Sequence, residues 1–142
     1  MKIMTPEEAR QFLIEKPRTG KIASVRKDGR PHITPIWFVL DGDHLVFTTW
    51  YESVKAHALR HDPRVTICVD DDEPPYAYVI VEGTAEFLNP TPEERIEWAT
   101  RIARRYLGDA LAETFGKRNG VEGELVLRVT PTKIVAHRNI AD

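Results

Sequence analysis

The chain between residues 20 and 88 alternates apolar and polar side chains in short runs separated by tight turns, and this pattern constrains the fold most. Lys21–Arg26, Pro31–Leu40 and His44–Thr49 are predicted strands. Asp28-Gly29 joins the first pair and Asp41-Gly42-Asp43 joins the second, both typical of hairpins. Turns this short cannot carry the crossover that a parallel pair needs, so the sequence predicts an antiparallel sheet.

Four further segments have strand character: Val65–Asp70, Ala77–Leu88, Glu124–Val129 and Lys133–His137. Ala77–Leu88 alternates most clearly, with valines on one face and glutamates and a threonine on the other. The last two segments are predicted to be separate strands on either side of Pro131. With 142 residues, the chain is expected to form one domain, residues 1–142, built as an antiparallel β-barrel.

Two copies of one capping sequence predict the starts of two longer helices. Thr5-Pro6-Glu7-Glu8 and Thr91-Pro92-Glu93-Glu94 each supply a capping threonine, a proline for the first helical position and a glutamate that completes a capping box. The first helix is predicted to end at Pro17 and the second near Gly108. A short third helix is predicted to begin at Ser53 and to end at Asp62-Pro63.

The overall charge excludes one class of function and the cysteine count indicates a compartment. A net charge of −2 argues against a protein that clamps nucleic acid electrostatically. The one cysteine, Cys68, rules out an intramolecular disulfide, so we expect a reducing, cytoplasmic environment. No apolar run approaches the ~20 residues of a membrane span, so we expect no membrane partner.

The predicted strand Pro31–Leu40 is apolar on both of its faces. Ile33, Trp37 and Val39 share one face, while Ile36, Phe38 and Leu40 share the other. A small barrel needs only one apolar face per strand. We therefore expect the second face to meet another surface, most simply that of a second copy in a homodimer.

The segment Thr48–Lys55 holds the strongest candidate for a binding site. It runs from a strand end through a short loop into a helix start, where Thr48, Thr49 and Ser53 offer hydroxyls and Lys55 offers a charge. Hydroxyls, a helix N-terminus and an ammonium group suit a phosphate. A capped helix with a solvated lysine explains the same spacing, and the spacing alone favours that interpretation because such caps are common.

Other candidate sites are weaker, and no catalytic residue can be named. His57 and His61 have a metal-ligand spacing, but no third ligand is evident, so a solvated helix face is favoured and no metal is predicted. No G-x-S-x-G, Walker A or dinucleotide motif is present. If the protein is an enzyme, a cofactor is expected to supply the chemistry. The aromatic side chains of the strand region could line a pocket for a flat ring or fill the core: Trp37, Phe38, Trp50, Tyr51, Tyr76 and Tyr78.

A series of motifs, in this order and spacing, resembles one known family over roughly half the chain, from Gly20 to Phe87. The motifs are Gly20-Lys21-Ile22-Ala23-Ser24-Val25, Asp28-Gly29-Arg30-Pro31-His32, Pro35-Ile36-Trp37-Phe38, Asp41-Gly42-Asp43, Val46-Phe47-Thr48-Thr49, Ser53-Val54-Lys55, Leu59-Arg60-His61-Asp62-Pro63-Arg64-Val65 and Tyr78-Val79-Ile80-Val81-Glu82-Gly83-Thr84-Ala85-Glu86. Together they resemble the pyridoxamine 5′-phosphate oxidase-like superfamily. The resemblance implies a mainly β (α+β) fold: an antiparallel, six-stranded split β-barrel of Greek-key type with a few flanking helices.

The resemblance also implies a homodimer with a cofactor at the interface, either flavin mononucleotide (FMN) or the deazaflavin coenzyme F-420. In the family pattern, Lys55 meets the cofactor phosphate together with the hydroxyls of Thr49 and Ser53. The strand Pro35-Ile36-Trp37 runs beside the ring system. Three more cofactor-binding candidates lie within the matching motifs: Thr48, Arg60 and Tyr78. Ala58 departs from the pattern, since close relatives carry asparagine there, so one polar contact is expected to be missing.

The function implied is that of an oxidoreductase which moves a hydride between the bound flavin or deazaflavin and a small conjugated organic substrate. The residues by which true pyridoxamine phosphate oxidases grip their substrate are not found, so oxidation of vitamin B6 is not expected. The alternative is a protein that binds FMN or haem without turnover, as a carrier, store or sensor. Haem would need an axial ligand such as one of the five histidines, His32, His44, His57, His61 and His137. A barrel that binds oligonucleotides is the least favoured of the alternatives.

Overall fold

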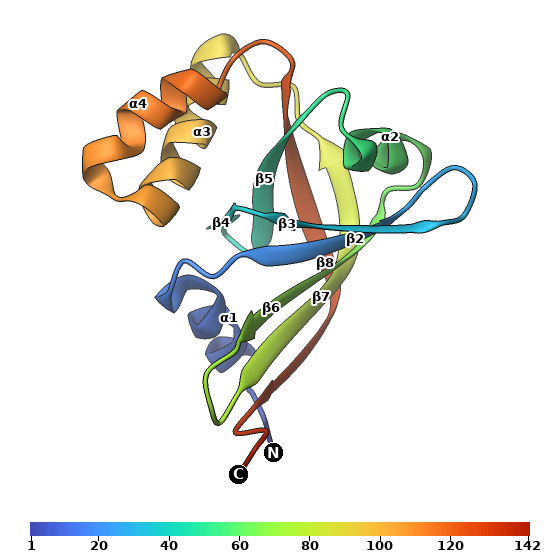
Figure 1. Ribbon diagram of the computed structural model, residues 1–142, viewed down its shortest axis with the longest axis vertical. Helices are drawn as coiled ribbons and strands as arrows, with labels where there is room; N and C mark the ends of the chain where they lie inside the picture. Colours follow the sequence, from blue (N-terminus) through green and yellow to red (C-terminus); the bar gives the residue numbers. More distant parts are fainter.

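A computed structural model describes residues 1–142, and its main feature is one strongly curled antiparallel sheet (Figure 1). The sheet runs in the order β3-β2-β6-β7-β8-β5-β4, and β1 pairs with β8. The strands are β1 (Lys2–Ile3), β2 (Gly20–Val25), β3 (Pro31–Ile36), β4 (Phe38–Asp41), β5 (His44–Trp50), β6 (Arg64–Asp71), β7 (Ala77–Phe87) and β8 (Glu124–Arg138). The predicted mainly β (α+β) class and antiparallel architecture are confirmed, but the sheet is 8-stranded rather than six-stranded.

Two strand boundaries differ from the prediction. The predicted strand Pro31–Leu40 is divided at Trp37 into β3 and β4, which lie at opposite ends of the strand order. In contrast, β8 continues through Pro131, which pairs with Gly83 where the register between β7 and β8 shifts. A proline is tolerated there because the irregular ladder does not need its missing N–H.

Four helices flank the sheet: α1 (Pro6–Glu15), α2 (Val54–His61), α3 (Pro92–Leu107) and α4 (Asp109–Asn119). Both predicted capping boxes are present, at Thr5 and at Thr91. α4 was not expected, because Gly108 reads as a helix end and α4 begins there without a side-chain cap. Figure 1 shows the α3–α4 hairpin on the side of the sheet near β4 and β5, with α2 on the opposite side.

The main core fills the curled sheet, and α1 closes one end of it. A second, smaller cluster consists of Val39, Val46, Val126 and Ile102, and it lies under α3. The second face of β4 is therefore covered by α3 of the same chain, which corrects the expectation that a partner must cover the whole face. Only the β3 end stays open, where Ile33 is 65% exposed and Trp37 is 38% exposed.

No helix of the structure combines the length and the apolar character needed to span a membrane.

Candidate functional site

A cavity of about 350 Å³ lies where the β3–β4 junction, the first turn of α2 and the α3–α4 hairpin meet. Five of the nine residues predicted from the sequence line it together: Pro35, Ile36, Trp37, Thr48 and Lys55. The rest of its wall comes from Thr19, Ala99, Ile102, Ala103 and Asn119. The fold thus brings the predicted ring-binding strand and the predicted phosphate anchor into one pocket, which we call the Lys55 pocket.

Trp37 forms one wall of the Lys55 pocket and is held in place by Tyr106 of α3. The two rings are stacked, with centroids 5.0 Å apart and an interplanar angle of 6°. The Tyr106 hydroxyl accepts a hydrogen bond from the Phe38 N–H at 3.1 Å and donates one to the Arg18 carbonyl at 2.9 Å. Because the strand breaks at Trp37, the Phe38 N–H needs a partner outside the ladder, and Tyr106 supplies it.

Lys55 is half-buried at the pocket, and none of the ion pairs of the structure includes it. Burial lowers the pKa of Lys55, and the charge of Glu124 opposes that shift only in part. A half-buried ammonium without a counter-ion is electrostatically costly unless an anion binds to it. The lysine is therefore not the fully solvated side chain of the alternative interpretation, although the helix is capped as that interpretation required.

Glu124 was not among the predicted site residues. It begins β8 and pairs with Trp50, so only the strand pairing between β5 and β8 brings it to this place. The Thr48 hydroxyl donates to Oε2 of Glu124 at 3.4 Å. Burial raises the pKa of Glu124, while the Thr48 hydrogen bond and the Lys55 charge act in the opposite direction. No local motif in the sequence marks this residue.

Thr49 and Ser53 do not line the Lys55 pocket; they build the helix start that carries Lys55. Their hydroxyl oxygens lie 2.8 Å apart, and Ser53 Oγ accepts the Ala56 N–H at 3.1 Å as the N-cap of α2. Thr49 is buried, so this pair fixes the turn between β5 and α2. Their predicted contact with a phosphate stays a prediction.

Arg60 and Tyr78 do not line the Lys55 pocket of their own chain either. Arg60 lies in the last turn of α2, where Nη1 donates to the Tyr51 carbonyl at 3.0 Å and so braces the loop before the helix. Tyr78 lies at the start of β7, on the face opposite the buried Val79, and its ring centroid is 5.4 Å from that of His137. One copy of the chain therefore places seven of the nine residues in or directly behind one site.

The histidines do not enter the pocket lining. His32 is the histidine whose pKa is affected by the charge of Lys55. Burial lowers the pKa of His32, and the charges of Arg26 and Lys55 lower it further. His57 and His61 lie on α2, and no cluster of three or more His, Cys, Asp or Glu side chains with metal-binding geometry includes them.

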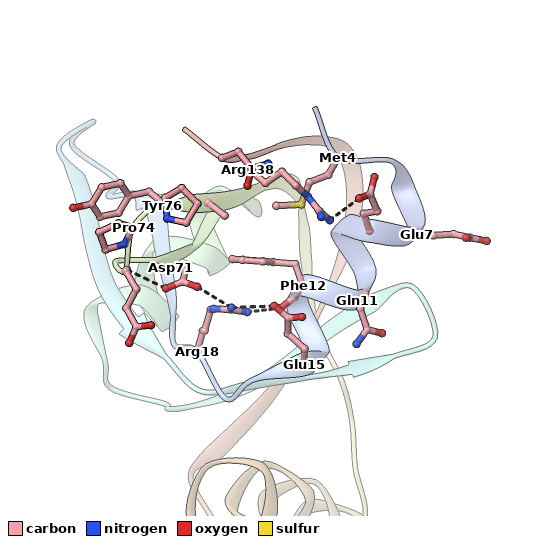
Figure 2. Close-up of a pocket in the computed structure, with 15 residues that line it drawn as sticks. Met4, Glu7, Gln11, Phe12, Glu15, Arg18, Asp71, Pro74, Tyr76 and Arg138 are labelled. Atoms are coloured by element: carbon pink, nitrogen blue, oxygen red, sulfur yellow. Dashed lines mark hydrogen bonds and ion pairs between the residues drawn. The ribbon is translucent and has the colours of Figure 1, made fainter. Parts of the chain in front are cut away.

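A larger cleft of about 570 Å³ lies between α1 and the β6–β7 loop. It contains none of the nine predicted cofactor-binding residues, although Tyr76, one of the aromatic candidates, lines it. Figure 2 shows that its charged side chains bind each other: Arg18 contacts Asp71 at 3.2 Å and Glu15 at 3.0 Å. Arg138 similarly contacts Glu8 at 2.6 Å. Because these arginines are already paired, the cleft offers no free cation, and the Lys55 pocket is the better candidate site.

Comparison with known proteins identifies the family. The sequence matches the family model described as pyridoxamine 5′-phosphate oxidase over residues 5–138. The chain belongs to this family. The resemblance noted from the motifs is thereby confirmed, and with it the split-barrel fold.

Solved structures of related proteins agree. A conserved hypothetical protein from Mycobacterium tuberculosis has 26% identity and a TM-score of 0.81, with 96% of this chain and 86% of that one covered. A structure described as an F-420 reductase has 29% identity and a TM-score of 0.69, with 87% and 94% covered. A haem storage protein from Vibrio cholerae shares the fold at 16% identity and a TM-score of 0.73, with 96% and 98% covered.

Proposed function

We propose that this protein is an oxidoreductase that binds a flavin-type cofactor, coenzyme F-420 or FMN, in the Lys55 pocket. The observation that carries the proposal is the half-buried Lys55 ammonium, unpaired and placed in one cavity with Trp37. The 29% identity to a structure described as an F-420 reductase supports it. When bound, such a cofactor supplies hydride transfer, here to or from a small conjugated organic substrate.

The residues present fit such a cofactor at both of its ends. Lys55 would bind the phosphate, with the Thr48 hydroxyl and the positive end of α2 beside it. Pro35, Ile36 and Trp37 offer a flat, largely apolar wall for the ring. Ala99, Ile102 and Ala103 of α3 line the same cavity and add to its apolar wall. A volume of about 350 Å³ lies at the small end of the range for such sites.

The open rim of the pocket supports a homodimer with the cofactor at the interface. Ile33 of β3 is 65% exposed, and Trp37 is still 38% exposed although its ring stacks on Tyr106 of α3. A second copy seated there would bury both side chains and complete a cavity that one chain leaves small. Tyr78 and Arg60, which do not line their own pocket, would then contact a cofactor only across the interface.

The chain's own residues provide binding and orientation, and we assign no general acid or base among them. Tyr106 fixes the plane of Trp37, the Thr49–Ser53 pair fixes the start of α2, and Lys55 holds the charge. The single free cysteine, Cys68, fits the proposed cytoplasmic location.

Haem binding is less well supported in this pocket. No histidine lines it, and a haem iron needs an axial ligand such as histidine. A flavin-binding protein without turnover uses the same pocket and differs only in lacking a substrate.

The test is a side-by-side titration of purified protein with FMN and with coenzyme F-420, followed by fluorescence. Binding of F-420 alone would place the protein among deazaflavin-dependent reductases, and reducible conjugated compounds would then be screened for turnover. Binding of FMN alone would favour an oxidase or a flavin carrier. In an oxidase a substrate would reduce the bound flavin and oxygen would reoxidise it, whereas in a carrier no substrate would reduce it. Binding of neither would refute the proposal.

A further inference from the structure

A carboxylate lies beside the proposed phosphate anchor, where an anionic ligand would not be expected to tolerate it. Glu124 is the one acidic group whose charge acts on Lys55, and Lys55 is the one charged group that acts on Glu124. No ion pair joins the two side chains directly. Thr48 connects the carboxylate with the pocket: its hydroxyl donates a hydrogen bond to Glu124 at 3.4 Å, and Thr48 lines the pocket together with Lys55.

The negative charge of Glu124 is more favourable in the protein without ligand than in the protein with a phosphate bound at Lys55. With no ligand, an ionised Glu124 partly offsets the cost of the half-buried ammonium. A phosphate on Lys55 would take over that role and would place a second negative charge near the carboxylate. Protonation of Glu124 removes this repulsion, and the neutral acid keeps its hydrogen bond with Thr48.

We propose that Glu124, whose charge partly offsets the burial of Lys55 without forming an ion pair with it, is a specificity-determining residue that takes up a proton when a phosphate-bearing ligand binds. The inference rests on the proposed function, because it needs a ligand phosphate at Lys55. It goes beyond that function in making affinity depend on a second residue and on pH. Ligands without the phosphate are indifferent to Glu124.

The titratable groups around the pair are few. Lys55 faces Glu124 from α2 and Thr48 faces it from β5. His32 of β3 is affected by the charge of Lys55, and Arg26 Nη2 lies 3.3 Å from His32 Nδ1, but neither His32 nor Arg26 is among the groups that shift the pKa of Lys55 or of Glu124. These side chains are all present in a Glu124→Gln variant, which loses only the carboxylate and its effect on Lys55, and the intrinsic ionisation of the ligand phosphate is the same for both proteins. The ratio of their dissociation constants therefore isolates Glu124.

The experiment measures dissociation constants of FMN and of riboflavin, which lacks the phosphate, for the wild type and for Glu124→Gln across neutral and mildly acidic pH. For FMN, the wild-type constant divided by the variant constant is expected to be near one in acid and to rise with pH. A rise of about tenfold corresponds to two unit charges roughly 12 Å apart at an effective dielectric constant of about 20. For riboflavin the ratio is expected to stay constant with pH.

A ratio for FMN that does not change with pH would overturn the inference. A ratio for riboflavin that rises as much as the ratio for FMN would also overturn it, because Glu124 would then act on the ring or on the fold. If Glu124→Gln does not fold, Thr48→Val provides the second test. Loss of the Thr48 donor should move the pH midpoint of FMN binding upward, and an unmoved midpoint would count against the inference. If only coenzyme F-420 binds, the same ratio is measured with it. Failure of the wild type to bind either cofactor at any pH would instead refute the proposed function.

Discussion

Tyr106→Phe tests whether the Tyr106 hydroxyl stabilises the β3–β4 junction, which forms one wall of the Lys55 pocket. The substitution keeps the ring that stacks on Trp37 at 5.0 Å and removes only the hydroxyl. That hydroxyl serves two backbone groups, the Phe38 N–H at 3.1 Å and the Arg18 carbonyl at 2.9 Å. Leaving a buried backbone group without a partner costs about 1–3 kcal/mol. Since both groups are only part-buried, we expect the free energy of unfolding to fall by about 2–3 kcal/mol in total.

Urea denaturation followed by circular dichroism measures this loss. The midpoint should fall while the slope of the free energy against urea stays unchanged, because the same surface is exposed on unfolding. Tyr51→Phe is the matched control: the Tyr51 ring is exposed and its hydroxyl makes no hydrogen bond, so a change within about 0.5 kcal/mol is expected. If Tyr106→Phe is as stable as the control, the Tyr106 hydroxyl does not hold the β3–β4 junction, and the account of the break at Trp37 is wrong.

Three further outcomes follow from the structure. Gly116→Ala should destabilise the protein by about 1–3 kcal/mol in thermal or urea unfolding, because the added Cβ would lie 2.9 Å from the Thr100 Cα; a neutral result would mean that α3 and α4 pack less closely. Trp37→Ala should cost more free energy of cofactor binding than free energy of unfolding, since this side chain is 38% exposed; a larger loss of unfolding free energy would place Trp37 in the core. Burial raises the folded-state pKa of Glu124, so wild-type stability should fall as pH rises from the ordinary glutamate value of 4.5 through the raised pKa. Glu124→Gln should therefore be more stable than wild type at neutral pH and should lose that advantage in acid; parallel pH profiles would contradict the shift.

Much of the fold could be predicted from local pattern. The alternation in Ala77–Leu88 and the two threonine capping boxes each depend on neighbouring residues only, and the structure confirms them. The missed features depend on contacts between distant segments. β8 passes Pro131 because Gly83 accommodates it on the neighbouring strand, and α4 is stable because it packs on α3. A single sequence contains no direct signal for either contact.

The candidate site likewise has parts that the sequence predicted and parts that depend on contacts between distant segments. The motif around Lys55 and the strand ending at Trp37 were identified from their own residues and from the family resemblance, and the fold places both in one pocket. Tyr106 lies in the predicted helix that begins at Thr91, but nothing in the sequence connects that helix with Trp37, so the role of Tyr106 beside Trp37 could not be predicted. Glu124 reaches Thr48 only through the β5–β8 register, which no motif records.

If Lys55 anchors a cofactor phosphate, Lys55→Met should weaken cofactor binding without harming the fold. Methionine keeps the length and apolar stem of the side chain, so packing is preserved while the charge is lost. Because burial lowers the pKa of Lys55, its charged form is disfavoured in the folded protein, and the variant should be at least as stable as wild type without cofactor.

The measurement is the dissociation constant of FMN and of coenzyme F-420 for wild type and for Lys55→Met at neutral pH. The account predicts that the variant weakens binding of the preferred cofactor by about 1.5–3 kcal/mol, or roughly 10- to 150-fold, with no loss of stability. An unchanged dissociation constant in a folded variant would remove Lys55 from the site and contradict the account.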